Sequence, residues 1–215
     1  MISYYSVTRF LAGCWFRIAT GWEVTGRERV PLAGGLVVAS NHISFWDPPL
    51  VGSALPRGTY FLAKEELFAT PVLGPVIRSL HALPIRRGLA DLSGMSRAIE
   101  VLKRGEALLM FPEGSRMRDG ELHPSRPGVG LIAVSADVPI VPCYISGSGR
   151  PGKWWNRSSR VRISFGGARS WQDLAGPDSD HTPGRALYQR VGDAVMREIT
   201  ELKAGQKKAA SRGAA

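Results

Sequence analysis

Cysteine and histidine are both scarce in this chain. Among 215 residues there are two cysteines, Cys14 and Cys143, and four histidines. Two cysteines that lie far apart in apolar stretches cannot form a disulfide framework, so the sequence indicates a reducing compartment. The histidines are His42, His81, His123 and His181. They are scattered and form no metal-ligand cluster, so we expect neither a metal site nor a cofactor.

Long apolar runs are missing as well. The N-terminal segment is interrupted by Arg9 and Arg17, which excludes a membrane span of ~20 apolar residues, and it lacks the apolar core and cleavage site of a signal peptide. Residues 1–21 are instead predicted to form an amphipathic helix in the plane of a membrane interface. Packing on the protein's own core would give the same pattern. The apolar face would consist of Tyr4, Val7, Leu11, Cys14, Trp15, Ile18 and Trp22.

Acidic residues are outnumbered by basic ones, 18 against 28, which gives a formal net charge of +10. Such an excess suits anionic lipid, nucleic acid or an acidic protein as a partner. The basic residues match no nucleic-acid-binding motif, so no nucleic acid is expected. The segment 153–157 interleaves cations with Trp154 and Trp155. It could stack on bases, but a membrane interface or simple packing explains it better.

Short apolar segments alternate with helical patterns along the chain. This predicts an α/β fold, a single domain with a mostly parallel central sheet flanked by helices, plus the N-terminal amphipathic helix. One domain over residues 22–203 fits the length, and residues 204–215 are predicted to be a disordered basic tail. Strands are predicted at 35–40, 59–63, 82–85, 106–111, 139–145 and 160–165, and helices at 48–55, 71–80, 91–104, 127–136 and 183–203.

A histidine and an aspartate frame the most informative stretch, Asn41-His42-Ile43-Ser44-Phe45-Trp46-Asp47. It follows the predicted strand 35–40, and Pro48 and Pro49 suit the first turn of a helix. The pair would therefore lie at a strand-to-helix turn, where open α/β sheets bind ligands. A carboxylate beside an imidazole fixes its tautomer and raises its basicity, as a general base requires. A histidine satisfied within a turn is the structural alternative.

A second turn, Phe111-Pro112-Glu113-Gly114-Ser115-Arg116, follows another predicted strand. Its composition predicts a tight turn with free backbone N–H groups, and Arg116 offers a planar donor fork suited to phosphate. A surface turn with a solvated Glu113–Arg116 pair is the alternative. A third segment, 61–87, ends in two arginines that would supply further cationic charge. No serine or cysteine nucleophile motif accompanies these turns, which favours direct transfer to a deprotonated hydroxyl.

Together these segments resemble the 1-acylglycerol-3-phosphate acyltransferase (lysophosphatidic acid acyltransferase) family. An ordered set of blocks is far more specific than any single block. The resemblance covers about residues 22–170. Four blocks match in order: NHISFWD at 41–47, AKEELF through RR at 63–87, FPEGSR at 111–116 and VPIVPCYISG at 138–147.

The resemblance implies an enzyme that moves a fatty acyl group from acyl-CoA or acyl carrier protein to the free hydroxyl of 1-acylglycerol-3-phosphate. The product would be phosphatidic acid, in phospholipid synthesis. His42 would be the general base, oriented by Asp47, and the Gly114 N–H is a candidate oxyanion donor. Arg126 stands near a position before Gly128 where the family usually has lysine, with Pro127 between them, and on that basis it is assigned no role. The acceptor would be bound by Lys64, Arg87, Glu113, Gly114, Ser115 and Arg116.

The implied partners are lysophosphatidic acid, the acyl donor and a phospholipid surface. The protein would then lie on the cytoplasmic face of a membrane, as a peripheral or monotopic protein. Two alternatives stay open. The acceptor could be another lysophospholipid or hydroxylated lipid, or the chain could be a non-catalytic basic module that binds lipid or nucleic acid.

Overall fold

One seven-stranded sheet organises the described part of the chain. The computed structural model describes residues 4–86, 91–149, 160–176 and 179–212. The strand order is β1-β7-β6-β2-β5-β3-β4, and every neighbouring pair is parallel except β6 and β7. The predicted α/β fold with a mostly parallel sheet is confirmed. The strands are β1 (Glu23–Thr25), β2 (Leu36–Ser40), β3 (Thr59–Lys64), β4 (Ala82–Ile85), β5 (Ala107–Met110), β6 (Ile140–Ser146) and β7 (Arg162–Phe165).

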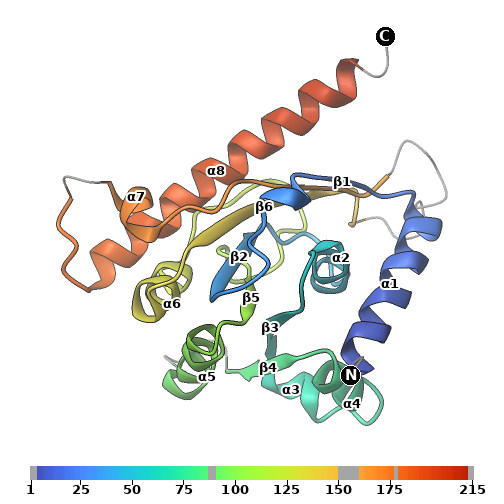
Figure 1. Ribbon diagram of the computed structural model, residues 1–215, viewed down its shortest axis with the longest axis horizontal. Coiled ribbons are helices and arrows are strands. Elements are labelled where there is room, and N and C mark those ends of the chain that lie inside the picture. The colour runs from blue at the N-terminus through green and yellow to red at the C-terminus, as the bar shows by residue number, and fades with distance from the viewer. Residues whose placement is uncertain (1–3, 87–90, 150–159, 177–178, 213–215) are drawn as a thin grey trace.

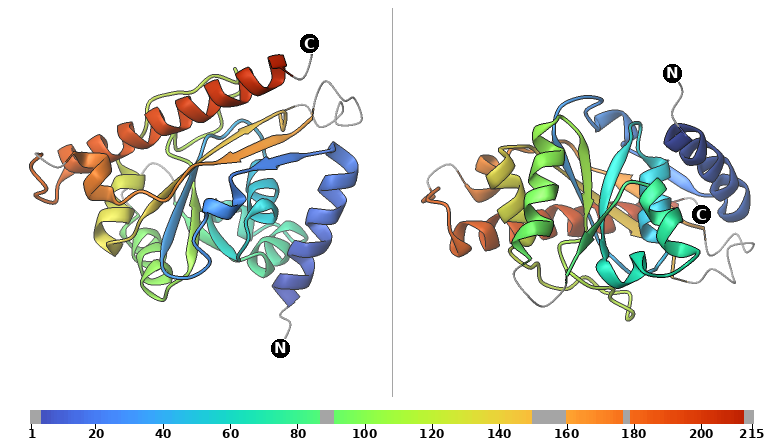
Figure 2. Two further views of the ribbon diagram at one scale, coloured as in Figure 1. Left: turned by 45° about the horizontal axis from the view of Figure 1, so that its top comes forward. Right: turned by 90° about the horizontal axis from the view of Figure 1, so that it is seen from below.

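Helices cover both faces of this sheet (Figures 1 and 2). Helices α5, α6 and α8 pack on one face, and α1 and α2 pack on the other. The helices are α1 (Tyr4–Thr20), α2 (Asp47–Ala54), α3 (Glu65–Phe68), α4 (Leu73–Ser79), α5 (Leu92–Lys103), α6 (Gly128–Ala136), α7 (Trp171–Ala175) and α8 (Arg185–Arg212), with a 3-10 turn η1 (Arg27–Arg29).

The central strand β2 is buried along its whole length. Its alternate residues pack into the apolar cores on opposite faces of the sheet. Val37 and Ala39 pack with residues of α5, α6 and α8, whereas Leu36 and Val38 pack with α1 and α2. Burial on both faces explains why a parallel strand has a continuous apolar sequence rather than an alternating one. This packing fixes the point at which β2 ends.

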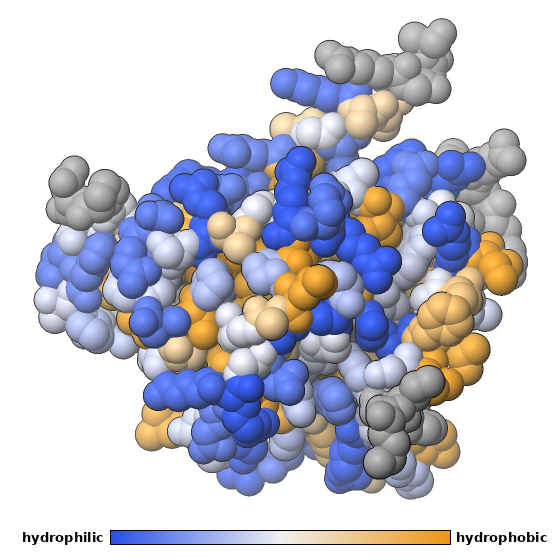
Figure 3. All heavy atoms as spheres, viewed as in Figure 1, coloured by the Kyte–Doolittle hydropathy of each residue, from blue (hydrophilic) through white to orange (hydrophobic). Residues whose placement is uncertain are grey.

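The two explanations of the N-terminal segment each account for one side of α1. Phe16 is buried in the core to which α2 contributes, and Ala19 is buried as well. Part of the predicted apolar face is exposed, with Leu11 60% and Ile18 82% exposed, whereas Trp22 packs on that core. Figure 3 shows apolar side chains gathered along this edge of the molecule. No helix among the described residues combines the length and apolar character that a membrane crossing requires.

The prediction of a disordered tail at 204–215 is wrong for the described part of that segment, because α8 continues to Arg212. The side chain of Gln206 holds the extension on the sheet. Its Oε1 accepts the Ser146 hydroxyl at 2.8 Å, and its Nε2 donates to Ser164 Oγ at 2.9 Å. A lysine- and alanine-rich sequence suits a helix as well as a tail, and these contacts favour the helix.

Candidate active site

Three adjacent strands bring the predicted site together. Strands β6, β2 and β5 are neighbours and run parallel, so their carboxyl ends lie at one edge of the sheet. His42 follows β2 by two residues, and Asp47 begins α2. Pro48 and Pro49 occupy the first helical turn, as predicted. The site thus lies where open α/β sheets bind ligands.

His42 and Asp47 form a buried pair. Nδ1 of His42 lies 2.9 Å from Oδ2 of Asp47, and the side chains are 8% and 0% exposed. The backbone N–H groups of Ile43 and Ser44 also donate to Oδ2, each at 2.7 Å. A carboxylate that accepts these donors remains an acceptor for the Nδ1–H of His42. That tautomer leaves Nε2 as the ring nitrogen for proton transfer.

Glu113 joins the two turns of the site from within. It is 2% exposed. Its Oε2 accepts the backbone N–H of His42 at 2.9 Å, and its Oε1 accepts that of His123 at 3.1 Å. Burial raises the pKa of Glu113, and these two N–H bonds oppose that rise. Both oxygens are therefore engaged in holding loops, a role that differs from the expected direct contact with the acceptor.

Further contacts immobilise His42 and the turn that carries it. The ring of His42 stacks on Phe111, with centroids 4.0 Å apart, and its carbonyl accepts the Met117 N–H at 2.7 Å. Asn41 makes a two-point contact with the backbone of Ile145, donating at 3.0 Å and accepting at 2.8 Å. The sequence did not indicate these supporting roles, because each depends on residues from a different strand or loop.

The Gly114 N–H does not serve the expected oxyanion role in this geometry. It donates to the Phe111 carbonyl at 2.9 Å and so closes its own turn. Gly114 has φ 73°, and a Cβ there would lie 2.6 Å from Cδ of Arg126. Glycine is required because it tolerates positive φ and leaves room for this side chain. Arg126, which the sequence left without a role, thus packs over the turn.

The remaining predicted residues are spread along the same edge. Arg116 is exposed, and its guanidinium carbon lies 5.8 Å from the ring centroid of Phe45. Ser115 is half-buried within the turn. Lys64 is exposed at the end of β3, which β5 separates from β2. Arg87 and the tryptophan segment 153–157 lie outside the described residues.

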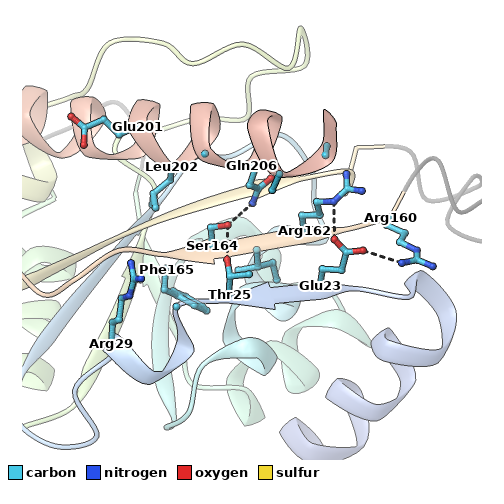
Figure 4. Close-up of a pocket in the computed structure, with 15 residues that line it drawn as sticks. Glu23, Thr25, Arg29, Arg160, Arg162, Ser164, Phe165, Glu201, Leu202 and Gln206 are labelled. Atoms are coloured by element: carbon cyan, nitrogen blue, oxygen red, sulfur yellow. Dashed lines mark hydrogen bonds and ion pairs between the residues drawn. The ribbon is translucent and has the colours of Figure 1, made fainter. Parts of the chain in front are cut away.

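A groove lies on another part of the protein, away from His42. It has a volume of about 600 Å³ and lies between the C-terminal half of α8 and strands β1 and β7 (Figure 4). Glu23 bridges Arg160 and Arg162 at 2.9 Å each, so two of its cations are already paired. Neither His42 nor Asp47 lines it. In the described ranges, no three metal-binding side chains are placed to share an ion.

Comparisons with known proteins find related sequences along most of the chain. A family model described as Acyltransferase matches residues 21–146. A Bacillus subtilis protein named 1-acyl-sn-glycerol-3-phosphate acyltransferase is 28% identical over 184 residues, covering 85% of this chain and 88% of the relative. A Pseudomonas aeruginosa lyso-ornithine lipid O-acyltransferase is 36% identical over 129 residues, covering 60% of this chain and 49% of the relative.

One solved structure has the same fold. The crystal structure of the 1-acyl-sn-glycerophosphate (LPA) acyltransferase PlsC from Thermotoga maritima matches with a TM-score of 0.68 and 26% identity. The match covers 93% of this chain and 81% of that one. It therefore includes the sheet and the helices on both of its faces.

Proposed function

Because this chain belongs to the acyltransferase family, we propose that it transfers a fatty acyl group from an acyl thioester to the free hydroxyl of 1-acylglycerol-3-phosphate. The product is phosphatidic acid, formed in phospholipid synthesis. The relatives from Bacillus subtilis and Thermotoga maritima support the choice of acceptor. The observation that carries the chemistry is the buried contact of 2.9 Å between His42 and Asp47.

The proposed reaction needs a base but no covalent enzyme intermediate. Nε2 of His42 takes the proton of the acceptor hydroxyl as its oxygen attacks the thioester carbonyl. Asp47 stabilises the imidazolium that forms. The tetrahedral intermediate collapses, the carbon–sulfur bond breaks, and the imidazolium returns the proton to the thiolate. A new ester bond and a free thiol result.

Arginines beside the second turn are proposed to bind the acceptor phosphate. Arg116 and Arg126 are both exposed, and a guanidinium fork matches phosphate oxygens in two-point contacts. Arg116→Ala should raise the KM for the phosphorylated acceptor about tenfold, since a charge-assisted hydrogen bond contributes ~1.5–3 kcal/mol. Arg118→Ala removes an exposed arginine two residues away and serves as control. Equal KM values in both variants would remove Arg116 from the site.

A second acceptor class has specific support. The Pseudomonas aeruginosa relative is named as acting on a lyso-ornithine lipid. Another lysolipid with a free hydroxyl is therefore the second candidate acceptor. Competition between this lipid and lysophosphatidic acid for one limiting thioester would rank the two acceptors.

A membrane surface is the proposed source of the acceptor. Phe10, Leu11 and Ile18 of α1 are 60–82% exposed, and Phe45 in the catalytic turn is 50% exposed. Aromatic and aliphatic side chains on an in-plane helix insert at the interface. The double change Phe10→Ser/Ile18→Ser should weaken sedimentation with phosphatidylglycerol liposomes. Leu92→Ser, also at a strongly exposed leucine, is the control, and equal sedimentation of all proteins would refute this surface.

The deciding assay combines purified protein, lysophosphatidic acid and a long-chain acyl thioester. The thioester is supplied once as acyl-CoA and once as the acyl thioester of acyl carrier protein, because the donor is proposed only as a thioester. Phosphatidic acid should form with the native protein and fall at least 100-fold with His42→Ala, within the range that a positioned base contributes. Product from the variant at the native rate would assign the base elsewhere.

A further inference from the structure

The Asp47 carboxylate has a hydrogen-bond donor that comes from a distant part of the chain. The hydroxyl of Ser148 donates to Oδ1 of Asp47 at 2.5 Å, across 101 residues of sequence. Both residues are 0% exposed. The donors to the other oxygen, Oδ2, all come from the turn 42–44 itself. Ser148 is thus the contact through which strand β6 reaches the proposed catalytic pair.

We propose that Ser148 is a positioning residue for acyl transfer. Its hydroxyl fixes the orientation and the charge distribution of the Asp47 carboxylate, which in turn orients His42. This role rests on the proposed function of His42 and Asp47. It assigns a task to a residue that belongs to none of the four sequence blocks.

The local chain path is built to deliver this hydroxyl. Strand β6 ends at Ser146, and Gly147 then adopts φ 81°. A Cβ at Gly147 would lie 2.3 Å from the Arg160 carbonyl oxygen, so another residue would require the chain to move. Only after this turn does Ser148 enter the buried space beside Asp47. Glycine at position 147 is therefore required for the turn that places Ser148 beside Asp47.

The energetic argument concerns Oδ1. Water does not reach a fully buried carboxylate, so an oxygen that loses its donor is left without solvation. Hydrogen bonds to a carboxylate lower its basicity. Without Ser148, Asp47 should attract the imidazolium proton more strongly, and the acidic limb of the activity profile should move to higher pH.

Ser148→Ala tests this role, with Ser40→Ala as the matched control. Ser40 is also 0% exposed, lies on β2, and donates to the Asn41 carbonyl rather than to Asp47. In Ser148→Ala, kcat should fall about tenfold, as expected for one lost hydrogen bond to a charged group, while the KM for the acceptor stays the same. The acidic limb of kcat/KM should move upward by about half to one pH unit. Ser40→Ala should leave that limb in place.

Two conservative variants keep the test decisive if Ser148→Ala folds poorly. Ser148→Thr retains the hydroxyl and should keep the native limb. Ser148→Cys retains the side-chain position but offers a weaker donor, so its limb should move in the same direction by a smaller amount. Thermal unfolding of each variant reports folding separately.

The outcomes separate this role from the proposed function. A limb that stays in place in both Ser148→Ala and Ser148→Cys would overturn the positioning role, even if stability falls. If His42→Ala still abolishes transfer in that case, the proposed function stands. Native transfer by His42→Ala would instead overturn the proposed function itself.

Discussion

Two histidine–aspartate pairs of similar length lie in contrasting surroundings. In His42–Asp47 the nitrogen and oxygen are 2.9 Å apart and the side chains 8% and 0% exposed. In His123–Asp119 they are 2.7 Å apart, but the side chains are 41% and 53% exposed. An exposed pair interacts in a high dielectric and competes with water. The shorter distance therefore does not distinguish the proposed general base, whereas burial and surrounding donors do.

The two pairs are joined through one carboxylate. Glu113 accepts the backbone N–H of His42 with one oxygen and that of His123 with the other. The buried histidine is also held by Phe111 and Met117. On the exposed side, the hydrogen bond from His123 lowers the pKa of Asp119. Changing each member of this arrangement in turn shows which features of the buried pair matter.

The largest effect is expected from Asp47→Asn. The asparagine oxygen can replace Oδ2 and accept the same turn donors, while its amide faces Ser148, whose hydroxyl can rotate to accept. The fold should persist, but the imidazolium loses its negative partner. We expect kcat to fall about 10²–10⁴-fold, the range of general-base catalysis.

The assay is phosphatidic acid formation at saturating acceptor, with thermal unfolding as the control for folding. Near-native kcat in a folded Asp47→Asn protein would show that the charge of Asp47 does not act in catalysis. The buried pair would then differ from the exposed pair in burial and contacts but not in a contribution to kcat.

An intermediate effect is expected from Glu113→Gln. The glutamine oxygen can accept one of the two backbone N–H groups, and its own N–H₂ then faces the other. One buried donor without a partner costs ~1–3 kcal/mol of stability. The loop that carries His42 should loosen, and kcat should fall about ten- to a hundredfold. Stability and kcat both equal to the native values would show that Glu113 holds neither loop.

The same variant tests a pH dependence of stability. Burial raises the pKa of Glu113, so the folded protein keeps this proton at pH values where the unfolded chain has lost it. The contribution of Glu113 to the free energy of unfolding is present below its ordinary pKa and is lost as the pH rises through the raised value. Denaturant unfolding across this window should show a shallower fall with rising pH in Glu113→Gln. Identical slopes in the native protein and in Glu113→Gln would contradict a raised pKa of Glu113.

The buried pair could be predicted from sequence because its geometry is local. His42 and Asp47 lie in one short turn between an apolar strand and two prolines. Residues 42–44 of that turn supply three of the four described donors to Asp47, and Ser148 supplies the fourth. The strands and helices predicted after residue 22 agree with the structure to within two residues, apart from the C-terminal end of α8. Their apolar runs are long enough to show periodicity. Strand β1, with three residues and polar Glu23 and Thr25, gave no such signal.

Residues whose roles depend on distant contacts could not be predicted. The contact between Ser148 and Asp47 requires β6 beside β2 and a turn at Gly147. The Gly114 N–H, a candidate oxyanion donor from the sequence, closes its own turn with the Phe111 carbonyl. Arg126 lacked a role until its packing over Gly114 was visible. Sequence spacing carries no information about the contacts of Ser148 and Arg126.

The smallest effect is expected from His123→Ala, and it tests the comparison most directly. The substitution removes the imidazole of the shorter, exposed pair but keeps the backbone N–H that Glu113 accepts. If burial defines the base, kcat and its pH profile should stay within about twofold of the native protein, because an exposed ion pair contributes ~0–1 kcal/mol. The measurement is the same transfer assay from pH 5 to 9, run beside His42→Ala. A hundredfold loss in His123→Ala would transfer the proposed catalytic role to the exposed pair, and Glu113 would then serve the chemistry through its other oxygen.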